Sequence, residues 1–370
     1  MKKRRWLSAA FLLCALTAGC SRTAETSATA APAAETERVI YIDSETEAPK
    51  EAGGAIQERI KKDGMLPSYL TGEWIPAEIA DRRPIAVMIS NDQAALPHYG
   101  MSRAGVIYEA PVEGGMNRFM AFFEDYDDLE RIGSVRSCRT YYTYFAREFE
   151  AVCVHYGQSK FALPYLEQMD HLDGIAGAGA SAFFRSSDRR SPHNAYASGA
   201  GIRAAIEKSG YADAYPASYE GHYRFAAKES PVLLEDGIEA GYIRPGYQIG
   251  DPWFTYNEED GLYYRFQYGG PHETDEGQLT AKNILFQYCV WDYYSPSEYL
   301  DINVHTSYGG YYFTNGRGIP IRWEKDGTYG VTKYYDSDGQ EIVLNPGTTW
   351  VCILQADRLD KAEIYGKQTE

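Results

Sequence analysis

The chain has 370 residues and a formal net charge of −16, and 32 of its residues are tyrosine. This length is enough for two domains of ordinary size. Nucleic acids and anionic wall polymers repel a protein of this charge, so the composition excludes nucleic acid as an expected partner and restricts any anion site to a local cluster of basic residues. Tyrosine fits half-buried β surfaces, which favours a β-rich fold.

The first twenty residues have the pattern of a lipoprotein signal. Residues 2–5 are basic, Leu7–Leu16 is apolar, and small residues precede Cys20, as in a secretory signal. The apolar run has about ten residues, well short of the roughly 20 that a membrane-spanning helix needs. The segment resembles the lipobox of bacterial lipoproteins, although Thr17 stands where that pattern favours Leu. We expect a signal peptide over residues 1–19, lipidation of Cys20, and a chain anchored by acyl chains at the extracytoplasmic face of the cell membrane. An ordinary secreted protein is the alternative.

The segment after Cys20 predicts a tether. Residues 20–66 are rich in Ala, Thr, Glu and Ser and have no sustained apolar periodicity. A segment of this composition cannot bury enough apolar surface to offset the entropy of ordering it. We therefore expect a disordered connection between the lipid anchor and the folded part of the chain.

Strand and helix patterns alternate over residues 67–235. Short apolar runs bounded by turn residues predict buried strands, and longer mixed runs predict helices. The expected strands are Ile85–Ile89, Val106–Tyr108, Phe119–Phe123 and Ala151–His155, and the expected helices are Tyr141–Phe149, Phe161–Met169 and Gly199–Lys208. This alternation predicts an N-terminal α/β layered domain.

Residues 240–365 have a different pattern, with many Gly and Tyr residues and alternating apolar positions. Asn-Gly and Asp-Gly pairs between apolar runs are strong hairpin signals. The expected strands are Leu262–Tyr268, Asn283–Val290, Leu300–Val304, Gly310–Thr314, Ile319–Trp323, Val331–Tyr335 and Trp350–Leu354. We expect a mainly antiparallel C-terminal β domain, which makes the fold class of the chain α+β.

Many short motifs, in order, resemble the YerB-like lipoproteins of Gram-positive bacteria, a two-domain family known by the label DUF3048. In the N-terminal half they are Arg83–Ile89, Tyr108-Glu109, Glu113–Gly115 with Arg118, Ile132–Ser137 with Arg139, Val154–Gly157, Asp170–Gly174 and Ser191–Asn194. In the C-terminal half they are Thr280–Asn283, Tyr312–Arg317, Arg322-Trp323 and Tyr334–Trp350. The resemblance implies a two-domain envelope lipoprotein and no particular reaction, substrate or cofactor. Cys138 departs from it, because family members often have Ala there, so we expect no essential role for that thiol.

The first candidate site is a pair of arginines at the expected start of a helix. Arg136 and Arg139 are three residues apart, and Ser137 between them is placed to cap the helix or to donate to a ligand. Guanidinium groups present a rigid fork to carboxylates and phosphates, and free N–H groups at a helix start favour anions. The alternative is that the arginines pair with carboxylates such as Glu109 and Glu113.

The second candidate is the turn Glu113-Gly114-Gly115 between two expected strands, followed by Arg118. Two glycines let the backbone approach a ligand closely or adopt a positive φ. A carboxylate beside arginines stays ionised, so Glu113 suits an ion pair or a ligand contact better than a general acid. A turn with a structural ion pair is the alternative.

The third candidate is a set of histidines. His155 ends an expected strand, and His193 and Asn194 lie in the loop Ser191–Asn194. Histidine serves as a base or proton carrier near neutral pH, and two histidines with Glu109 or Glu113 could act as base and orienting group or ligate a metal. A single histidine is more often structural. No metal-ligand spacing, Walker loop or nucleophile elbow occurs, so we expect no metal and no cofactor. Cys138, Cys153, Cys289 and Cys352 lack paired-motif spacing, and we expect small buried side chains rather than disulfides. Trp323 and Trp350 fit core packing better than a face for stacking sugar rings.

These observations lead to one hypothesis with two alternatives. The chain is expected to bind a small anionic or cell-wall-derived ligand through Arg136 and Arg139, with Ser137 and Asn194 donating hydrogen bonds. Glu113 is expected to orient Arg118 or to contact the ligand, and His155 and His193 are expected to line the pocket. The first alternative is a hydrolase or transferase of cell-wall material that uses His155 or His193 as its base. The second is an envelope scaffold that binds partners through residues 240–365. The sequence does not identify a protein partner.

Overall fold

The computed structural model describes residues 54–366. The predicted signal peptide, the lipidation site Cys20 and most of the predicted tether lie outside the described residues. The fold is α+β, with an α/β arrangement in the N-terminal part and antiparallel sheets in the C-terminal part. The helices are α1 (Ala77–Ala80), α2 (Thr140–Glu148), α3 (Leu163–Leu166) and α4 (Gly199–Ser209).

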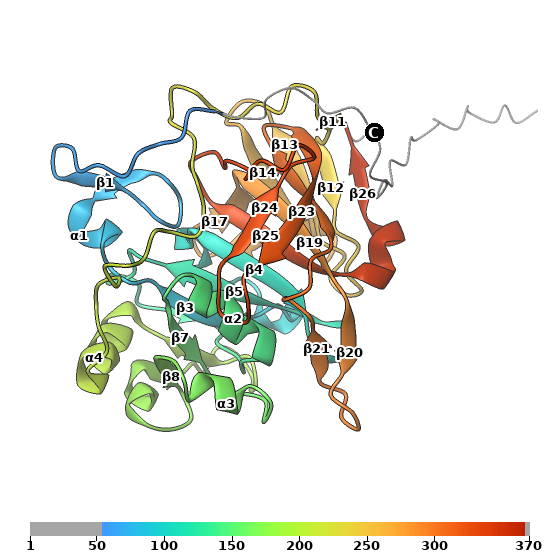
Figure 1. The fold of residues 1–370 in the computed structure, drawn as a ribbon. Helices are drawn as coiled ribbons and strands as arrows, with labels where there is room; N and C mark the ends of the chain where they lie inside the picture. The colour runs from blue at the N-terminus through green and yellow to red at the C-terminus, as the bar shows by residue number, and fades with distance from the viewer. Residues whose placement is uncertain (1–53, 367–370) are drawn as a thin grey trace, which may run out of the picture. The chain divides into compact units, whose positions relative to one another are not determined.

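An eleven-stranded central sheet runs through both predicted domains. Its strands are ordered β11-β23-β22-β19-β25-β4-β5-β3-β7-β8, and β24 pairs with β23 (Figure 1). The N-terminal strands are β3 (Ile85–Ser90), β4 (Val106–Pro111), β5 (Asn117–Phe123), β7 (Val152–His155) and β8 (His171–Asp173). The C-terminal strands are β11 (Ile238–Glu239), β19 (Asn283–Cys289), β22 (Gly309–Thr314), β23 (Arg317–Lys325), β24 (Thr332–Tyr335) and β25 (Thr349–Gln355).

Strand β25 joins the two parts of the central sheet. It pairs in parallel with β19 on one side and with β4 on the other, where Val351 lies opposite Tyr108. Every residue of β25 is buried. A nearly continuous apolar run is typical of a strand covered on both faces. The division into domains at residues 67–235 and 240–365 stays a prediction. Hydrogen bonds of the central sheet connect the two ranges, where β25 pairs with β4.

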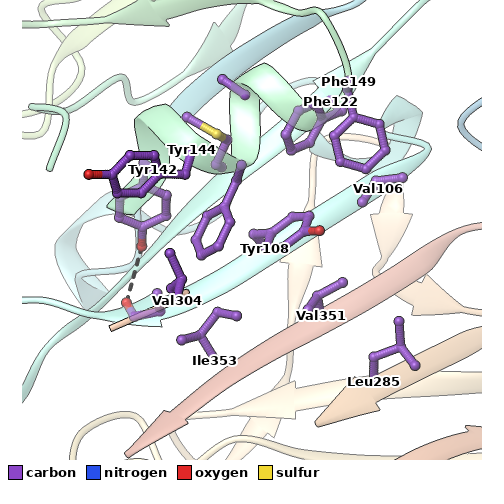
Figure 2. Close-up of a cluster of buried hydrophobic side chains, with 14 of the residues drawn as sticks. Val106, Tyr108, Phe122, Tyr142, Tyr144, Phe149, Leu285, Val304, Val351 and Ile353 are labelled. Atoms are coloured by element: carbon purple, nitrogen blue, oxygen red, sulfur yellow. Dashed lines mark hydrogen bonds between the residues drawn. The ribbon is translucent and has the colours of Figure 1, made fainter. Parts of the chain in front are cut away.

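Helix α2 packs on one face of the central sheet, and aromatic side chains fill the space between them (Figure 2). The rings of Tyr108 on β4 and Phe145 on α2 stack with their centroids 4.4 Å apart. The hydroxyl of Tyr142 on α2 donates to the carbonyl oxygens of Ala110, at 3.1 Å, and Arg118, at 2.6 Å. Because a buried hydroxyl needs a partner, these bonds fix α2 against the ends of β4 and β5.

Helix α4 and a second, six-stranded sheet pack against the opposite face of the central sheet, and their apolar side chains belong to one hydrophobic cluster with it. The second sheet has the order β15-β14-β13-β12-β26, and β18 pairs with β14. Its strands are β12 (Tyr242–Arg244), β13 (Trp253–Asn257), β14 (Leu262–Gln267), β15 (Gly270–Pro271), β18 (Thr280–Ala281) and β26 (Glu363–Tyr365). Phe254 of this sheet meets Trp350 of the central sheet, with ring centroids 5.5 Å apart, so aromatic contacts bind the two layers.

The remaining strands form short pairs and one three-stranded sheet. They are β1 (Met65–Pro67) with β2 (Trp74–Pro76), β6 (Ile132–Gly133) with β10 (Ala195–Ala197) and β9 (Phe183–Arg185), β16 (Glu273–Thr274) with β17 (Gly277–Gln278), and β20 (Trp291–Tyr293) with β21 (Leu300–Ile302). Residues 54–66, the end of the predicted tether, contact the folded part. The amide of Gln57 donates to the carbonyl oxygen of Phe225 at 2.8 Å, and Arg59 pairs with Asp81 at 2.8 Å.

Most expected elements are present, with one clear difference. The predicted helix Phe161–Met169 is only the single turn α3, followed by residues that bond in tighter turns, such as the amide of Gln168 to the carbonyl oxygen of Tyr165. Proline at position 164 fits a helix start, but four residues are too few to continue it alone. Trp323 and Trp350 are fully buried in the core. Buried, free thiols are found at Cys138, Cys153, Cys289 and Cys352.

Candidate functional site

Arg118 is a buried arginine without a carboxylate partner. It lies at the beginning of β5, opposite Ser90 on β3 and Ala110 on β4, and only 7% of its surface is exposed. Its Nη1 donates to the carbonyl oxygen of Ser137. Within residues 54–366, its Nε and Nη2 donate to no protein acceptor, and it makes no ion pair. Neither nitrogen is among the buried atoms that lack a partner, so this side of the guanidinium reaches solvent and is open to an anion.

Arg139, beside Arg118, is fully paired. Its Nε donates to both carboxylate oxygens of Glu113, at 2.8 and 3.0 Å, and its Nη2 donates to one of them at 2.7 Å. Its Nη1 also donates to the carbonyl oxygen of Ser137 at 3.4 Å, so Arg118 and Arg139 share one acceptor. Burial opposes the ionisation of Glu113, but the hydrogen bonds and charge of Arg139 outweigh it and lower the pKa of that carboxyl. Glu113 therefore neutralises Arg139 and leaves Arg118 unpaired.

Arg136 brings a third guanidinium to the cluster. Its amide donates to the carbonyl oxygen of Met88 on β3 at 2.9 Å, and its Nη1 donates to the carbonyl oxygen of Pro192 at 3.1 Å. Within residues 54–366 it makes no ion pair. Burial, and then the charge of Arg139, lower the pKa of Arg136. The same two causes lower the pKa of Arg118 to about 10, so both remain charged at neutral pH.

The three arginines share one carboxylate, so the cluster has an excess of two positive charges. We use the name arginine cluster for Arg118, Arg136, Arg139 and Glu113. Unpaired guanidinium groups that are partly removed from water attract anions strongly, since little solvent screens them. The arrangement can hold a carboxylate or a phosphate.

Two predicted site residues hold the loop that bears these arginines rather than face a ligand. His155 is fully buried. Its Nδ1 is 2.9 Å from the carbonyl oxygen of Gly157, which also accepts the amide of Cys138 at 3.0 Å. The hydroxyl of Ser137 donates to the carbonyl oxygen of Tyr156 at 3.0 Å. Both contacts position the segment between β6 and α2 that leads to Arg136 and Arg139.

The loop Ser191–Asn194 borders the cluster. The Nδ1 of His193 is 3.4 Å from the hydroxyl of Ser90, and its Nε2 is 3.8 Å from a carboxylate oxygen of Asp92. Burial lowers the pKa of His193, Asp92 opposes this shift, and Arg136 adds to it. The carboxamide of Asn194 accepts from Arg185 at 2.7 Å, so its partner is a side chain at the end of β9. Ser90 and Asp92 were missed by the sequence analysis, although they directly follow a predicted strand.

Glu109 lies in a separate buried network and not in the arginine cluster. It accepts two hydrogen bonds from Arg265 on β14, at 2.8 and 2.9 Å, and one from the indole of Trp350 at 3.1 Å. The other side of Arg265 is 2.7 Å from His272, which is 2.8 Å from His98. All five side chains are fully buried. Arg265 was missed, but its place in the alternation of Leu262–Gln267 puts it on the inward face with Tyr263.

Buried histidines make stability depend on pH. Burial lowers the pKa of His98 to about 3 and those of His155 and His222 to about 4. Below pH 6.5 the unfolded chain protonates them and the folded chain does not, so the free energy of unfolding is greatest above pH 6.5 and falls toward pH 4. Glu124 acts in the opposite sense, because burial raises its pKa to about 7.

Burial also lowers the pKa of His272 well below its usual value. Four histidines against one carboxyl leave a net loss of stability on acidification, up to roughly 1.4 kcal/mol per pH unit for each net proton. Urea unfolding at several pH values measures this loss. NMR of the imidazole carbons gives the pKa of each histidine. We expect the signals of His98, His155 and His222 to keep their neutral positions down to about pH 5. Titration of all three near pH 6.5 would contradict the prediction.

Similarity to known proteins agrees with this architecture. The family described as "Protein of unknown function (DUF3048) N-terminal domain" matches residues 70–212, and the corresponding C-terminal domain matches residues 243–351. The chain is 27% identical over 327 residues to "Putative lipoprotein YerB" of Bacillus subtilis (strain 168), covering 84% of this chain and 92% of the relative. The crystal structure of the YerB protein from Bacillus subtilis is similar, with a TM-score of 0.69 and 27% identity, over 81% of this chain and 99% of that one.

The fold and these matches define an α+β protein that carries the N-terminal and C-terminal DUF3048 sequences in order. The chain belongs to the YerB-like DUF3048 family. Among residues 54–366, no helix is long and apolar enough to cross a membrane. In the same range, no group of three or more His, Cys, Asp or Glu side chains is placed to hold a metal ion.

Proposed function

We propose that this chain is a lipoprotein anchored through Cys20 at the extracytoplasmic face of the cell membrane, where it binds a small anionic or cell-wall-derived ligand. The anchor is supported by the signal pattern of residues 1–20 and by the lipoprotein relative. Two acyl chains on one cysteine give stable anchoring. The binding proposal is supported by the arginine cluster.

The observation that carries this proposal is the unpaired guanidinium of Arg118. A buried charge without a partner costs free energy in the folded chain. The chain has 52 acidic residues and 36 Lys and Arg residues. Carboxylates thus outnumber basic side chains, but within residues 54–366 none of them pairs with Arg118. A ligand anion that accepts from Nε and Nη2 of Arg118 provides the missing charge.

Each residue of the cluster then has a distinct role. Arg118 and Arg136 bind the anion, and Arg139 is held in place by Glu113. Ser137 and His155 position the loop, and His193 lies at the border next to Arg136. Two guanidinium groups suit an oxyanion that accepts several hydrogen bonds, which means a phosphate or a carboxylate.

Replacing Arg136 with Ala should weaken anion binding by roughly 10–100-fold, since a hydrogen bond to a charged group contributes about 1.5–3 kcal/mol. Isothermal titration of the purified chain with inorganic phosphate, glycerol phosphate and acetate at low ionic strength measures the loss. The first two probes distinguish free phosphate from a phosphate ester of wall polymers, and the third tests carboxylates. The unfolding free energy should change little, because Arg136 donates only to one partly exposed backbone carbonyl.

The matched control is Arg190→Ala, which removes an exposed arginine from the neighbouring loop. It should bind the same anion as tightly as the unaltered chain. Equal weakening by both replacements would show a general charge effect and would contradict a site at Arg136. Unfolding of the Arg136→Ala chain would make that arginine structural.

A hydrolase is the second candidate, favoured by one arrangement. His193 lies between the hydroxyl of Ser90 and the carboxylate of Asp92. This is the order of nucleophile, base and orienting acid. The 3.8 Å separation of His193 and Asp92 exceeds hydrogen-bond reach and Ser90 is 4% exposed, which places this candidate second. Release of wall fragments that is lost on His193→Ala replacement would favour it.

A further inference from the structure

A cavity of about 250 Å³ is lined in part by Gly114 and Gly115, which follow the Glu113 that pairs with Arg139. Its walls come from the end of β4, the beginning of β5, the hairpin β20–β21 and the end of β25. The lining residues are Pro111, Val112, Gly114, Gly115, Asn117, Tyr247, Gln248, Trp291, Tyr293, Leu300 and Gln355. We call it the amide–aromatic pocket.

No lining residue of this pocket is charged. In a chain with 88 charged side chains in 370 residues, eleven uncharged lining residues indicate a site that does not select for an ion. The polar side chains are the carboxamides of Asn117, Gln248 and Gln355. A carboxamide both donates and accepts hydrogen bonds, which matches a ligand whose groups also do both, such as a hydroxyl.

Two of these carboxamides are buried and have unused hydrogen-bonding capacity. Asn117 is 4% exposed, and its Nδ2 donates to Glu109 at 2.8 Å. Its Oδ1 has no partner in the described part of the chain. Gln355 is 6% exposed, and its carboxamide is not among the buried atoms of residues 54–366 that lack a partner, so it reaches the solvent at the pocket. Buried polar atoms are nearly always satisfied, and the unpaired Oδ1 of Asn117 belongs to a residue that lines the pocket.

Aromatic rings form the other wall of the pocket. Tyr293 on β20 is 50% exposed, and its ring meets that of Trp291 edge-on, with centroids 5.2 Å apart. The indole of Trp291 donates to Asp357 at 2.8 Å, which fixes its orientation. Gly114 and Gly115 both have φ of 73°, and a Cβ on Gly115 would lie 2.8 Å from the Gln248 carboxamide. The glycines therefore leave the pocket mouth open beside an aromatic surface.

We propose that the amide–aromatic pocket binds one neutral sugar ring. A pyranose has apolar C–H faces that pack on aromatic rings, and hydroxyls at its edge that bond to carboxamides. Pockets for drug-sized molecules have volumes of about 300–1,000 Å³, so a cavity of about 250 Å³ suits a single ring. This site goes beyond the proposed anion site and shares no side chain with the arginine cluster.

Tryptophan fluorescence and saturation-transfer NMR on the purified chain test the proposal with methyl glucopyranoside and N-acetylglucosamine as neutral probes and glucuronate as a charged one. We expect saturable binding of at least one neutral probe. The Tyr293→Ala replacement should weaken it roughly ten-fold, which corresponds to about 1.4 kcal/mol. Gln355→Leu should weaken it too. The ring of Tyr293 is half exposed, so its removal should not unfold the chain.

Tyr308→Ala is the matched control, because it removes a partly exposed tyrosine outside the pocket lining, and it should bind as the unaltered chain does. Arg118→Met should also leave sugar binding unchanged, which separates this site from the anion site. Absence of saturable binding by both neutral probes, binding of glucuronate alone, or equal binding by the Tyr293→Ala chain would each overturn the proposal.

Discussion

Replacing Arg118 with Met should abolish anion binding and leave the chain at least as stable as before. Arg118 is 7% exposed and, in residues 54–366, pairs with no carboxylate. Replacing buried ionic groups with apolar side chains of similar size is often neutral or stabilising by about 1–4 kcal/mol. The carbonyl oxygen of Ser137 keeps a donor, because Arg139 Nη1 also reaches it. Functional sites frequently hold groups that the folded state would be more stable without.

Urea unfolding and phosphate titration of the same preparation measure the two effects together. Arg139→Met is the contrasting variant, because it strips Glu113 of its partner and should lower the unfolding free energy. Two neighbouring arginines of one cluster should thus have opposite effects on stability. A large loss of stability in the Arg118→Met chain would identify Arg118 as structural and would contradict the anion site.

The strands were predictable from the sequence because each depends on local patterning. Apolar runs such as Ile85–Ile89 and Phe119–Phe123 are inside β3 and β5. The Asn315-Gly316 pair has φ of 50° and 72° and connects β22 to β23, as its hairpin pattern indicates. Strand order was not predictable, since the parallel pairing of β25 with β4 joins residues more than 200 positions apart and no local pattern encodes it.

The candidate site was predictable only in part, because residue type does not fix the partner of a charge. From the sequence alone, either Glu109 or Glu113 could pair with the arginines. Glu113 pairs with Arg139, but Glu109 pairs with Arg265, 156 positions away. Arg118 belongs to one of the family motifs, but its lack of a carboxylate partner within residues 54–366 is visible only in three dimensions. The amide–aromatic pocket combines four distant segments, so its residues had no common signal in the sequence.

The largest loss of stability is expected from Arg265→Met. Arg265 and Glu109 are both fully buried and join β14 of the second sheet to β4 of the central sheet. Removal of one partner leaves the other as an uncompensated buried charge, which typically costs about 3–5 kcal/mol. The replacement also removes the donor to His272. Urea unfolding should therefore show a shift of the midpoint that is larger than for any surface ion pair.

Two further variants separate the charge effect from the packing effect. Arg244→Met removes a partly exposed arginine on β12 that pairs with Asp251 at 2.6 Å, and water-screened pairs of this kind contribute about 0–1 kcal/mol. Combining Glu109→Gln with Arg265→Met removes both charges and should restore much of the lost stability, since no ion is left unpaired. If the double replacement is no more stable than Arg265→Met alone, the loss comes from shape and hydrogen bonding around Trp350 and not from the stranded carboxylate.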